Sequence, residues 1–146
     1  MPGELIPQII AAILSAVLLA ISLLHFHWAG GGHWMVDATI PSTVDGKPLF
    51  SPTPKRTMLV AFGLAAGSLV ALERGFLWPG YLPPHFLNTG CWIFSAIFAA
   101  RVVGDFHFMG LFRRVRGTRF SRMDGLVYTP LSALFSLGFW ALLVMQ

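Results

Sequence analysis

Four long apolar stretches, separated by more polar ones, dominate the hydrophobic pattern of the chain. A helix needs about 20 mostly apolar residues to cross the hydrocarbon core of a bilayer. The four stretches meet or approach this length, and we predict helices over 5–28, 57–78, 86–112 and 124–145. Pro7 falls in the opening turn of the first helix, where its missing N–H is tolerated. Pro130 is expected to kink the fourth helix without ending it. The pattern therefore predicts an all-α, integral membrane four-helix bundle in a single domain, 1–146.

The first two stretches carry further signals. No Lys or Arg precedes the first stretch, and it is longer than the apolar part of a secretory signal, so we interpret it as a retained helix. In the second stretch, Gly63, Gly67 and Ala71 follow each other at four-residue intervals. Small residues at this spacing let a neighbouring helix approach closely. We expect a helix contact along this seam.

The composition favours a bilayer over water as the surroundings of the chain. Hydrophobic residues make up 55% and charged residues 11%, whereas a soluble domain carries about 25% charged residues. The net charge of +4 raises the question of nucleic acid, but no base-reading motif accompanies the basic residues, and we expect no nucleic-acid partner. Cys91 is the single cysteine, which excludes an intrachain disulfide and a cysteine metal site.

The distribution of Lys and Arg predicts the orientation in the membrane, because cytoplasmic loops carry the excess of positive charge. The long loop between the first and second helices and the loop between the third and fourth are basic; the opposite side has only Arg74. The basic residues of the two loops are Lys47, Lys55, Arg56, Arg113, Arg114, Arg116, Arg119 and Arg122. Both termini are therefore expected on the non-cytoplasmic side. Aromatic side chains are expected at the membrane interfaces, namely Trp28, Trp34, Trp78, Tyr81 and Trp140.

Three of the predicted helices bring polar side chains to the cytoplasmic end of the bundle. An arginine at membrane depth costs a few kcal/mol, so Arg101 should face the interior and have a partner. Asp105 lies four residues later, on the same helix face, and is the nearest candidate; Asp124 and Tyr128 are next. The candidate ligand-binding residues are His25, Trp28, Arg101, Asp105, Asp124 and Tyr128.

Each polar residue also has a purely structural interpretation. Ser121 and Asp124 have the spacing of a helix capping box, Arg101 and Asp105 could only lock helix packing, and His25 could donate to a carbonyl at a helix end. His25 and His27, like Asp105 and His107, are two residues apart, which points them to nearly opposite faces of a helix and forms no local metal chelate. His85 has no partner at its depth for haem ligation. We predict neither a metal nor a cofactor.

The loop over 29–56 is long for a small bundle. It begins AGGGHW and continues with four prolines, Pro41, Pro48, Pro52 and Pro54. Two interpretations are open: the loop folds back over the polar cluster as a cover, with Trp34 at the interface, or it is a plain surface loop.

The segments HFHWAGGGHW, RVVGDFHFMGLF and TRFSRMDGLVYTPL resemble a family of small bacterial membrane proteins described as domain of unknown function 3995. The likeness spans nearly the whole chain. Its motifs fall on His25 and Trp28, on Arg101, Gly104, Asp105 and Phe106, and on Asp124, Tyr128 and Pro130. The resemblance implies a four-helix integral membrane protein and supplies no biochemical activity. We expect a multi-pass protein of the bacterial inner membrane. His107 is not part of the pattern.

Three functions remain compatible with the sequence. The cluster could bind a small polar ligand or a lipid headgroup with Arg101 as anion anchor, or perform acid–base chemistry if the pKa of Asp105 or His25 is tuned towards neutrality. It could also serve helix docking alone, in a homo-oligomer or as an accessory or scaffold subunit of a larger membrane complex. No nucleophile elbow, phosphate loop or HExxH pattern occurs. Binding is therefore favoured, and whether the protein is an enzyme stays open.

Overall fold

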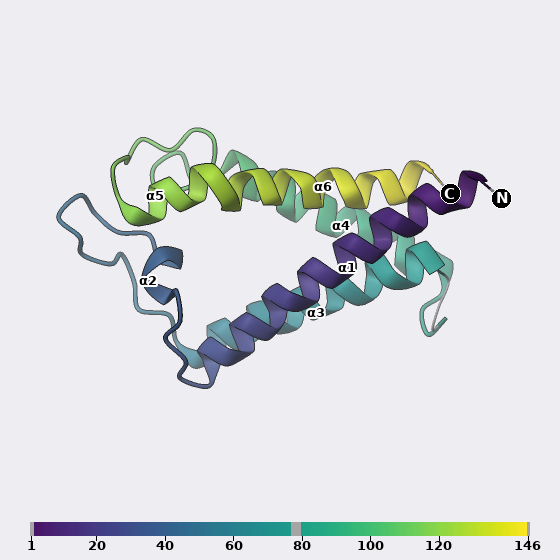
Figure 1. Ribbon diagram of the computed structural model, residues 1–146, viewed down its shortest axis with the longest axis horizontal. Helices are drawn as coiled ribbons and strands as arrows, with labels where there is room; N and C mark the ends of the chain where they lie inside the picture. The colour runs from purple at the N-terminus through teal and green to yellow at the C-terminus, as the bar shows by residue number, and fades with distance from the viewer. Residues whose placement is uncertain (1, 77–79, 146) are drawn as a thin grey trace.

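The computed structural model describes residues 2–76 and 80–145, and every named element in these two ranges is helical (Figure 1). In chain order they are α1 (Pro2–Ala29), α2 (Val36–Thr39), α3 (Pro54–Phe76), α4 (Pro84–Val103), α5 (Arg119–Met123), the π-helical turn η1 (Asp124–Tyr128) and α6 (Thr129–Val144). Four helices are long and apolar enough to cross a membrane: Leu5–Ala29, Pro54–Phe76, Pro84–Val103 and Arg119–Val144. The chain thus has the architecture of a multi-pass membrane protein.

The long helices form two pairs, α1 along α3 and α4 along α6 (Figure 1). The pairs meet near the two termini and diverge towards the opposite end, where α2 and the longer loops lie. The core between the pairs is aromatic and aliphatic. It contains Leu14, Leu18, Cys91, Phe135 and Phe139, with the rings of Phe94 and Phe139 stacked 5.2 Å apart. Many large apolar side chains point outward, as expected for helices that face lipid.

Serine hydroxyls link the helices inside each pair. In the α1–α3 pair, each helix donates one such bond to a backbone carbonyl of the other; in the α4–α6 pair, two serines bond each other's carbonyls. The bonds are Ser22 Oγ to Ala61 O (2.7 Å), Ser68 Oγ to Ser15 O (2.8 Å), Ser95 Oγ to Ser136 O (3.0 Å) and Ser136 Oγ to Ser95 O (2.9 Å). Interhelical hydrogen bonds of this kind stabilise helix association where there is no water to compete.

The small-residue seam of α3 differs from the predicted one by one position. No atom lies within 4 Å of where a Cβ on Gly63 would stand. A Cβ on Gly67 would lie 3.0 Å from the ring of Phe94 on α4, and one on Gly75 would clash with the Cβ of Ala11 on α1. Ala71, between them, is fully buried. The close contacts therefore lie along Gly67, Ala71 and Gly75, and Gly63 is not part of them.

The third helix was predicted over 86–112, and this prediction is wrong at its end. The helix begins at Pro84 and ends at Val103, because Gly104 adopts a φ of 81° that a helix cannot continue through. The second helix begins at Pro54; its predicted end at 78, like the predicted interface residue Trp78, lies outside the described residues.

The fourth helical segment begins earlier than the predicted Asp124. Thr118 caps α5: its hydroxyl accepts the N–H of Ser121, and the Ser121 hydroxyl accepts the N–H of Thr118. The predicted capping box of Ser121 with Asp124 is therefore wrong, since Ser121 itself is the inner residue of the box. Asp124 is left free for another role.

Pro130 does not end the fourth helical segment, in agreement with the prediction. The turn before it is widened, with the N–H of Thr129 bonded to the carbonyl of Asp124 five residues back. Because Pro130 has no N–H to offer and its ring crowds the preceding turn, local widening lets the helix continue. The helix then runs on to Val144.

Candidate functional site

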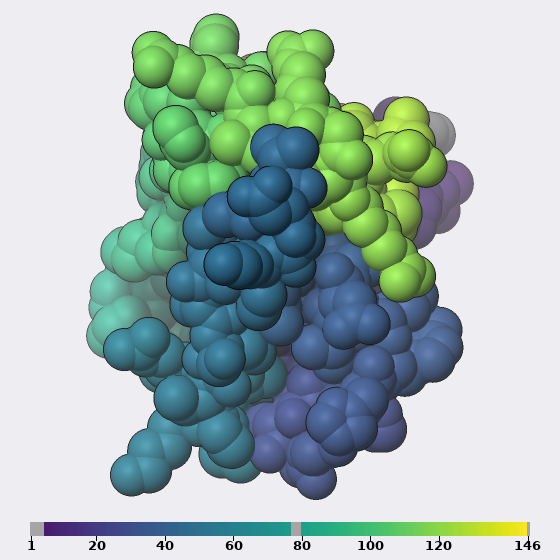
Figure 2. Space-filling view, turned by 90° about the vertical axis from the view of Figure 1, so that its left-hand side faces the viewer, coloured from purple at the N-terminus to yellow at the C-terminus, as the bar shows by residue number. Residues whose placement is uncertain are grey.

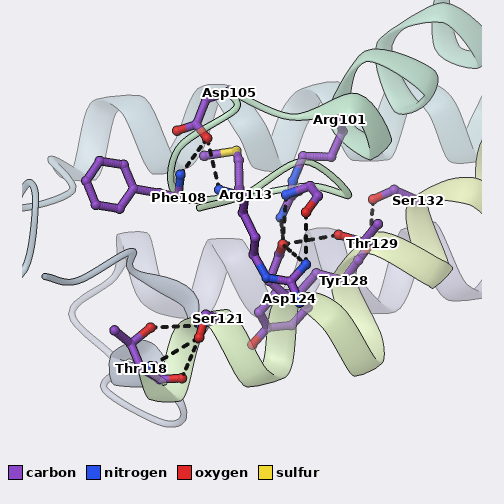
Figure 3. A network of polar contacts seen from close by, with 12 residues as sticks. Arg101, Asp105, Phe108, Arg113, Thr118, Ser121, Asp124, Tyr128, Thr129 and Ser132 are labelled. Carbon is purple, nitrogen blue, oxygen red and sulfur yellow. Dashed lines mark hydrogen bonds and ion pairs between the residues drawn. The ribbon is translucent and has the colours of Figure 1, made fainter. Parts of the chain in front are cut away.

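The carboxylate of Asp124 is the centre of a buried polar cluster (Figure 3). Its Oδ1 accepts a hydrogen bond from Arg101 Nη2 at 2.5 Å. Its Oδ2 accepts from the N–H of Gly110 at 2.8 Å and from Thr129 Oγ1 at 3.1 Å, and Arg113 Nη1 stands 3.6 Å away. Asp124 is 0% exposed. A buried carboxylate is stable only with partners of this kind.

Three segments of the chain supply these partners. Arg101 lies in the last turn of α4, Gly110 and Arg113 in the connection between α4 and α5, and Thr129 at the start of α6. The connection folds tightly back on the end of α4: the N–H of Leu111 bonds to the carbonyl of Val102 at 2.8 Å. The cluster therefore ties the end of one membrane helix to the beginning of another.

The backbone of the connection requires glycine at two positions. Gly104 and Gly110 have φ values of 81° and 85°. A Cβ on Gly104 would clash with the carbonyl of Met109, and one on Gly110 would lie 2.5 Å from the carbonyl oxygen of Val103. Positive φ and close backbone approach are the two conditions under which only glycine fits without strain.

Asp105 holds the turn between these glycines together. One carboxylate oxygen accepts the N–H groups of His107 at 2.9 Å, Met109 at 2.9 Å and Phe108 at 2.7 Å, the last of which is seen in Figure 3. Desolvation raises the pKa of this carboxyl group, but the backbone hydrogen bonds of Met109, His107 and Phe108 together outweigh it, so that the pKa lies below its ordinary value. Asp105 is thus a turn-forming carboxylate.

The predicted pairing of Arg101 with Asp105 is therefore wrong. It assumed that both residues lie on one helix, but α4 ends two residues before Asp105, and the side chain of Asp105 is exposed. Arg101 pairs instead with Asp124, the second candidate. The lowered pKa of Asp105 is also opposite in direction to the shift towards neutrality that acid–base chemistry there would need.

Positive charge exceeds negative charge inside the cluster. Two guanidinium groups, of Arg101 and Arg113, face the single carboxylate of Asp124. Among the described residues, Arg101 Nη1 and Arg113 Nε are buried and have no hydrogen-bond partner. The two side chains are nonetheless 26% and 17% exposed. Buried donors without partners are rare in native proteins and call for a specific explanation.

His25 and Trp28 lie in a different place, at the end of α1. His25 Nδ1 is 2.8 Å from the carbonyl oxygen of Ile21 on its own helix, and its ring meets that of Trp28 edge-on at 4.8 Å. Trp28 Nε1 donates to the carbonyl of Trp34 at 2.7 Å. In the part of the chain that the structure describes, no hydrogen bond or ion pair joins either residue to Arg101 or Asp124. The predicted grouping of all six residues is thus not reproduced by direct contacts.

Tyr128 connects the turn that contains Asp124 to α2, in the loop that follows α1. It belongs to the same π-helical turn as Asp124, and its hydroxyl donates to the carbonyl of Ala38 in α2 at 3.2 Å. Helix α2 packs against α5, and Ala38 is buried. Seen from this end of the molecule, the segment between α1 and α3 lies between the end of α1 and the α4–α5 connection (Figure 2). The 29–56 loop is therefore attached to the fourth helical segment, as the cover interpretation requires.

Sequence reasoning missed three participants: Gly110, Arg113 and Thr129. The sequence places Arg113 only among the loop arginines that set the orientation and contact lipid headgroups. A signal was present in the pair of glycines that flank Asp105, because two glycines and an aspartate within seven residues favour a loop over a helix. A loop there would have moved Asp105 away from Arg101. Among residues 2–76 and 80–145, no group of three or more His, Cys, Asp or Glu side chains is placed to hold a metal ion.

Comparisons with known proteins agree with the resemblance noted in the sequence. The family model described as "Protein of unknown function (DUF3995)" matches residues 18–139. The match includes every residue of the Asp124 cluster. No curated protein and no solved structure matches the chain.

Proposed function

Because the chain belongs to the DUF3995 family, whose function is unknown, we propose its function from the site alone: it binds an anionic group at the cluster of Arg101, Arg113 and Asp124. We call these three residues the arginine cluster. The anion belongs either to a lipid headgroup or to a small polar ligand such as a phosphate. In both cases the chemistry is the same, a negatively charged oxygen held by guanidinium groups.

One observation carries this proposal: two guanidinium groups share one carboxylate, and a buried N–H of each, Arg101 Nη1 and Arg113 Nε, has no protein partner among the described residues. A net positive charge near membrane depth is unfavourable without a counter-ion. An anionic oxygen would neutralise the excess charge and satisfy the free donors, and the partial exposure of both arginines gives it a way in.

The charge of the surrounding loops supports an orientation. We propose that the α2 and α5 end faces the cytoplasm of a bacterium and that both termini face away from it. Eight of the ten Lys and Arg residues lie at this end, in the connections between the long helices, in the first turn of α3 and in α5, and only Arg74 lies at the other. The arginine cluster would then meet the inner leaflet, where anionic lipids attract basic segments.

Phosphate binding by matched variants tests the proposal. Native mass spectrometry would measure retention of inorganic phosphate and of phosphatidylglycerol by wild type, Arg113→Gln and Arg116→Gln. Arg113→Gln removes the excess charge while Arg101 still pairs with Asp124; Arg116→Gln removes the same charge from an exposed position of the same loop. We expect loss of both probes in Arg113→Gln only. Retention of the lipid but not of inorganic phosphate by wild type would identify the source as a headgroup.

A docking role is the second candidate, and one observation favours it. The donors to Asp124 come from α4, from the α4–α5 connection and from α6, which is what a purely structural pin between helices needs. If wild type retains neither probe, and Arg113→Gln changes only thermal stability, the scaffold or accessory-subunit role replaces binding.

A further inference from the structure

An apolar groove runs along α1 at the end where the helix pairs diverge. Its lining residues come from α1 and from the loop that follows it: Ala16, Val17, Ala20, Ile21, Leu24 and Trp34. The groove is largely open to its surroundings, and its volume is about 610 Å³. None of its lining side chains carries a charge.

The groove follows from the geometry of the two helix pairs. Nearer the termini, Leu14 and Ile10 of α1 lie against α6 at Gly138, 3.3 Å and 3.9 Å from where a Cβ on that glycine would stand. Val17, Ile21 and Leu24 continue the same helix face at intervals of three and four residues. Because the pairs diverge towards this end (Figure 1), Val17, Ile21 and Leu24 are only partly buried, and Trp34 lines the groove beside them.

The surroundings of the groove determine what can fill it. Residues 16–24 lie inside a helix that is long and apolar enough to cross a membrane, so hydrocarbon is the medium next to the groove. Water and polar ligands would find no hydrogen-bond partner on the aliphatic side chains of α1. An acyl chain matches both the lining and the medium.

The groove and the arginine cluster are connected through a short piece of chain. Trp34 lines the groove, and Ala38, four residues later, accepts the hydrogen bond of Tyr128. Four residues span at most about 14 Å even when extended. Tyr128 and Asp124 are the two ends of the same π-helical turn. A single lipid molecule is long enough to reach from one place to the other.

We propose that the α1 groove and the arginine cluster form one site for an anionic phospholipid, with an acyl chain in the groove and the phosphate at the cluster. The position of the headgroup rests on the proposed function. The positive charge of the cluster, together with the basic loop over 113–122, selects an anionic phospholipid over a zwitterionic one.

Filling the groove tests this inference separately from the cluster. Ala20→Phe places a ring in the groove, and Ala12→Phe places the same ring at an exposed position of α1 outside it. Native mass spectrometry would measure retention of phosphatidylglycerol, phosphatidylcholine and inorganic phosphate by both variants, wild type and Arg113→Gln. Excluding about two CH₂ groups from the groove lowers affinity about tenfold. We expect this loss of phosphatidylglycerol in Ala20→Phe, with retention of phosphate unchanged, and no loss in Ala12→Phe.

The other outcomes separate the two proposals. If Ala20→Phe retains phosphatidylglycerol as well as Ala12→Phe does, while Arg113→Gln loses it, the groove inference is overturned and anion binding at the cluster stands. If Ala20→Phe loses the lipid and Arg113→Gln keeps it, the groove holds a chain whose headgroup lies elsewhere, which overturns the joint site and the proposed function together. Equal retention of phosphatidylcholine would overturn the selection for an anionic headgroup.

Discussion

Arg101 at the end of α4 and Asp124 in the π-helical turn before α6 form an ion pair with a nitrogen–oxygen distance of 2.5 Å across a sequence separation of 23 residues. Asp124 is fully buried, so its charge depends on this partner and on the donors around it. The pair fixes the ends of two membrane helices relative to each other and sets the position of the one excess positive charge. Structural and binding roles therefore meet at the same carboxylate.

Asp124→Asn should be strongly destabilising. The amide leaves two guanidinium groups without a counter-charge, and loss of one partner from a buried ion pair costs about 3–5 kcal/mol. Chemical denaturation in detergent micelles would measure the free energy of unfolding. Asp45→Asn, at an exposed position, is the matched control and should stay within about 0.5 kcal/mol of wild type. An Asp124→Asn protein as stable as its control would contradict the role given to the pair.

Gly75→Ala and Gly63→Ala should have different effects on stability although both lie in α3. A Cβ on Gly75 clashes with Ala11 of α1, whereas a Cβ on Gly63 meets no atom within 4 Å. Overpacking costs about 1–3 kcal/mol, while alanine in a free helix position gains up to about 1 kcal/mol over glycine. Thermal unfolding in detergent should therefore give a lower midpoint for Gly75→Ala and an equal or higher one for Gly63→Ala. Equal midpoints would mean that α1 and α3 do not approach closely at Gly75 and Ala11.

The sequence predicts the membrane helices well, because the thickness of the bilayer fixes the length of a spanning helix and the apolar composition of each stretch shows where such a helix lies. It predicts the ends of the helices poorly. The prediction for the third helix ran to 112 because the apolar pattern continues past Gly104, and hydropathy does not register that Gly104 and Gly110 bring two backbone segments into contact. Because of this error, Asp105 is predicted as the partner of Arg101 in place of Asp124. Arg113 was missed because its role depends on the fold of the connection, which no periodic pattern describes.

The turn held by Asp105 should loosen at acid pH. Because the pKa of Asp105 is lowered in the folded protein, its contribution to stability is fully present above the ordinary aspartate pKa of about 3.9. It is lost as the pH falls through the lower, folded value. Amide hydrogen exchange, corrected for intrinsic rates, should show protection at His107, Phe108 and Met109 that disappears in this acid range. In Asp105→Asn the protection of these amides should be weaker and should no longer change with pH. If the variant keeps the pH dependence of wild type, a group other than Asp105 causes that dependence.

The hydrogen bond from Tyr128 to Ala38 should hold α2 on the fourth helical segment. A neutral hydrogen bond contributes about 1 kcal/mol, which corresponds to roughly fivefold in a local opening equilibrium. Tyr128→Phe should therefore speed amide exchange over 36–39 by about this factor. Tyr81→Phe, whose side chain is 77% exposed, is the control and should leave this exchange unchanged. If Tyr128→Phe also leaves it unchanged, the loop is held by other contacts and its attachment through Tyr128 is not what keeps it in place.

The proposed orientation predicts which loops a membrane-impermeant thiol reagent can reach in intact cells. Cys91, the single native cysteine, is buried, so wild type should not react and serves as the blank. Tyr81→Cys replaces an exposed residue at the end with little positive charge, and Ser51→Cys replaces an exposed residue in the first basic loop. Because positive loops stay in the cytoplasm, we expect labelling of Tyr81→Cys from outside and labelling of Ser51→Cys only after the membrane is opened. The reverse labelling pattern would mean that the protein has the opposite orientation in the membrane. The arginine cluster would then face the leaflet where a surplus of anionic lipid is not expected.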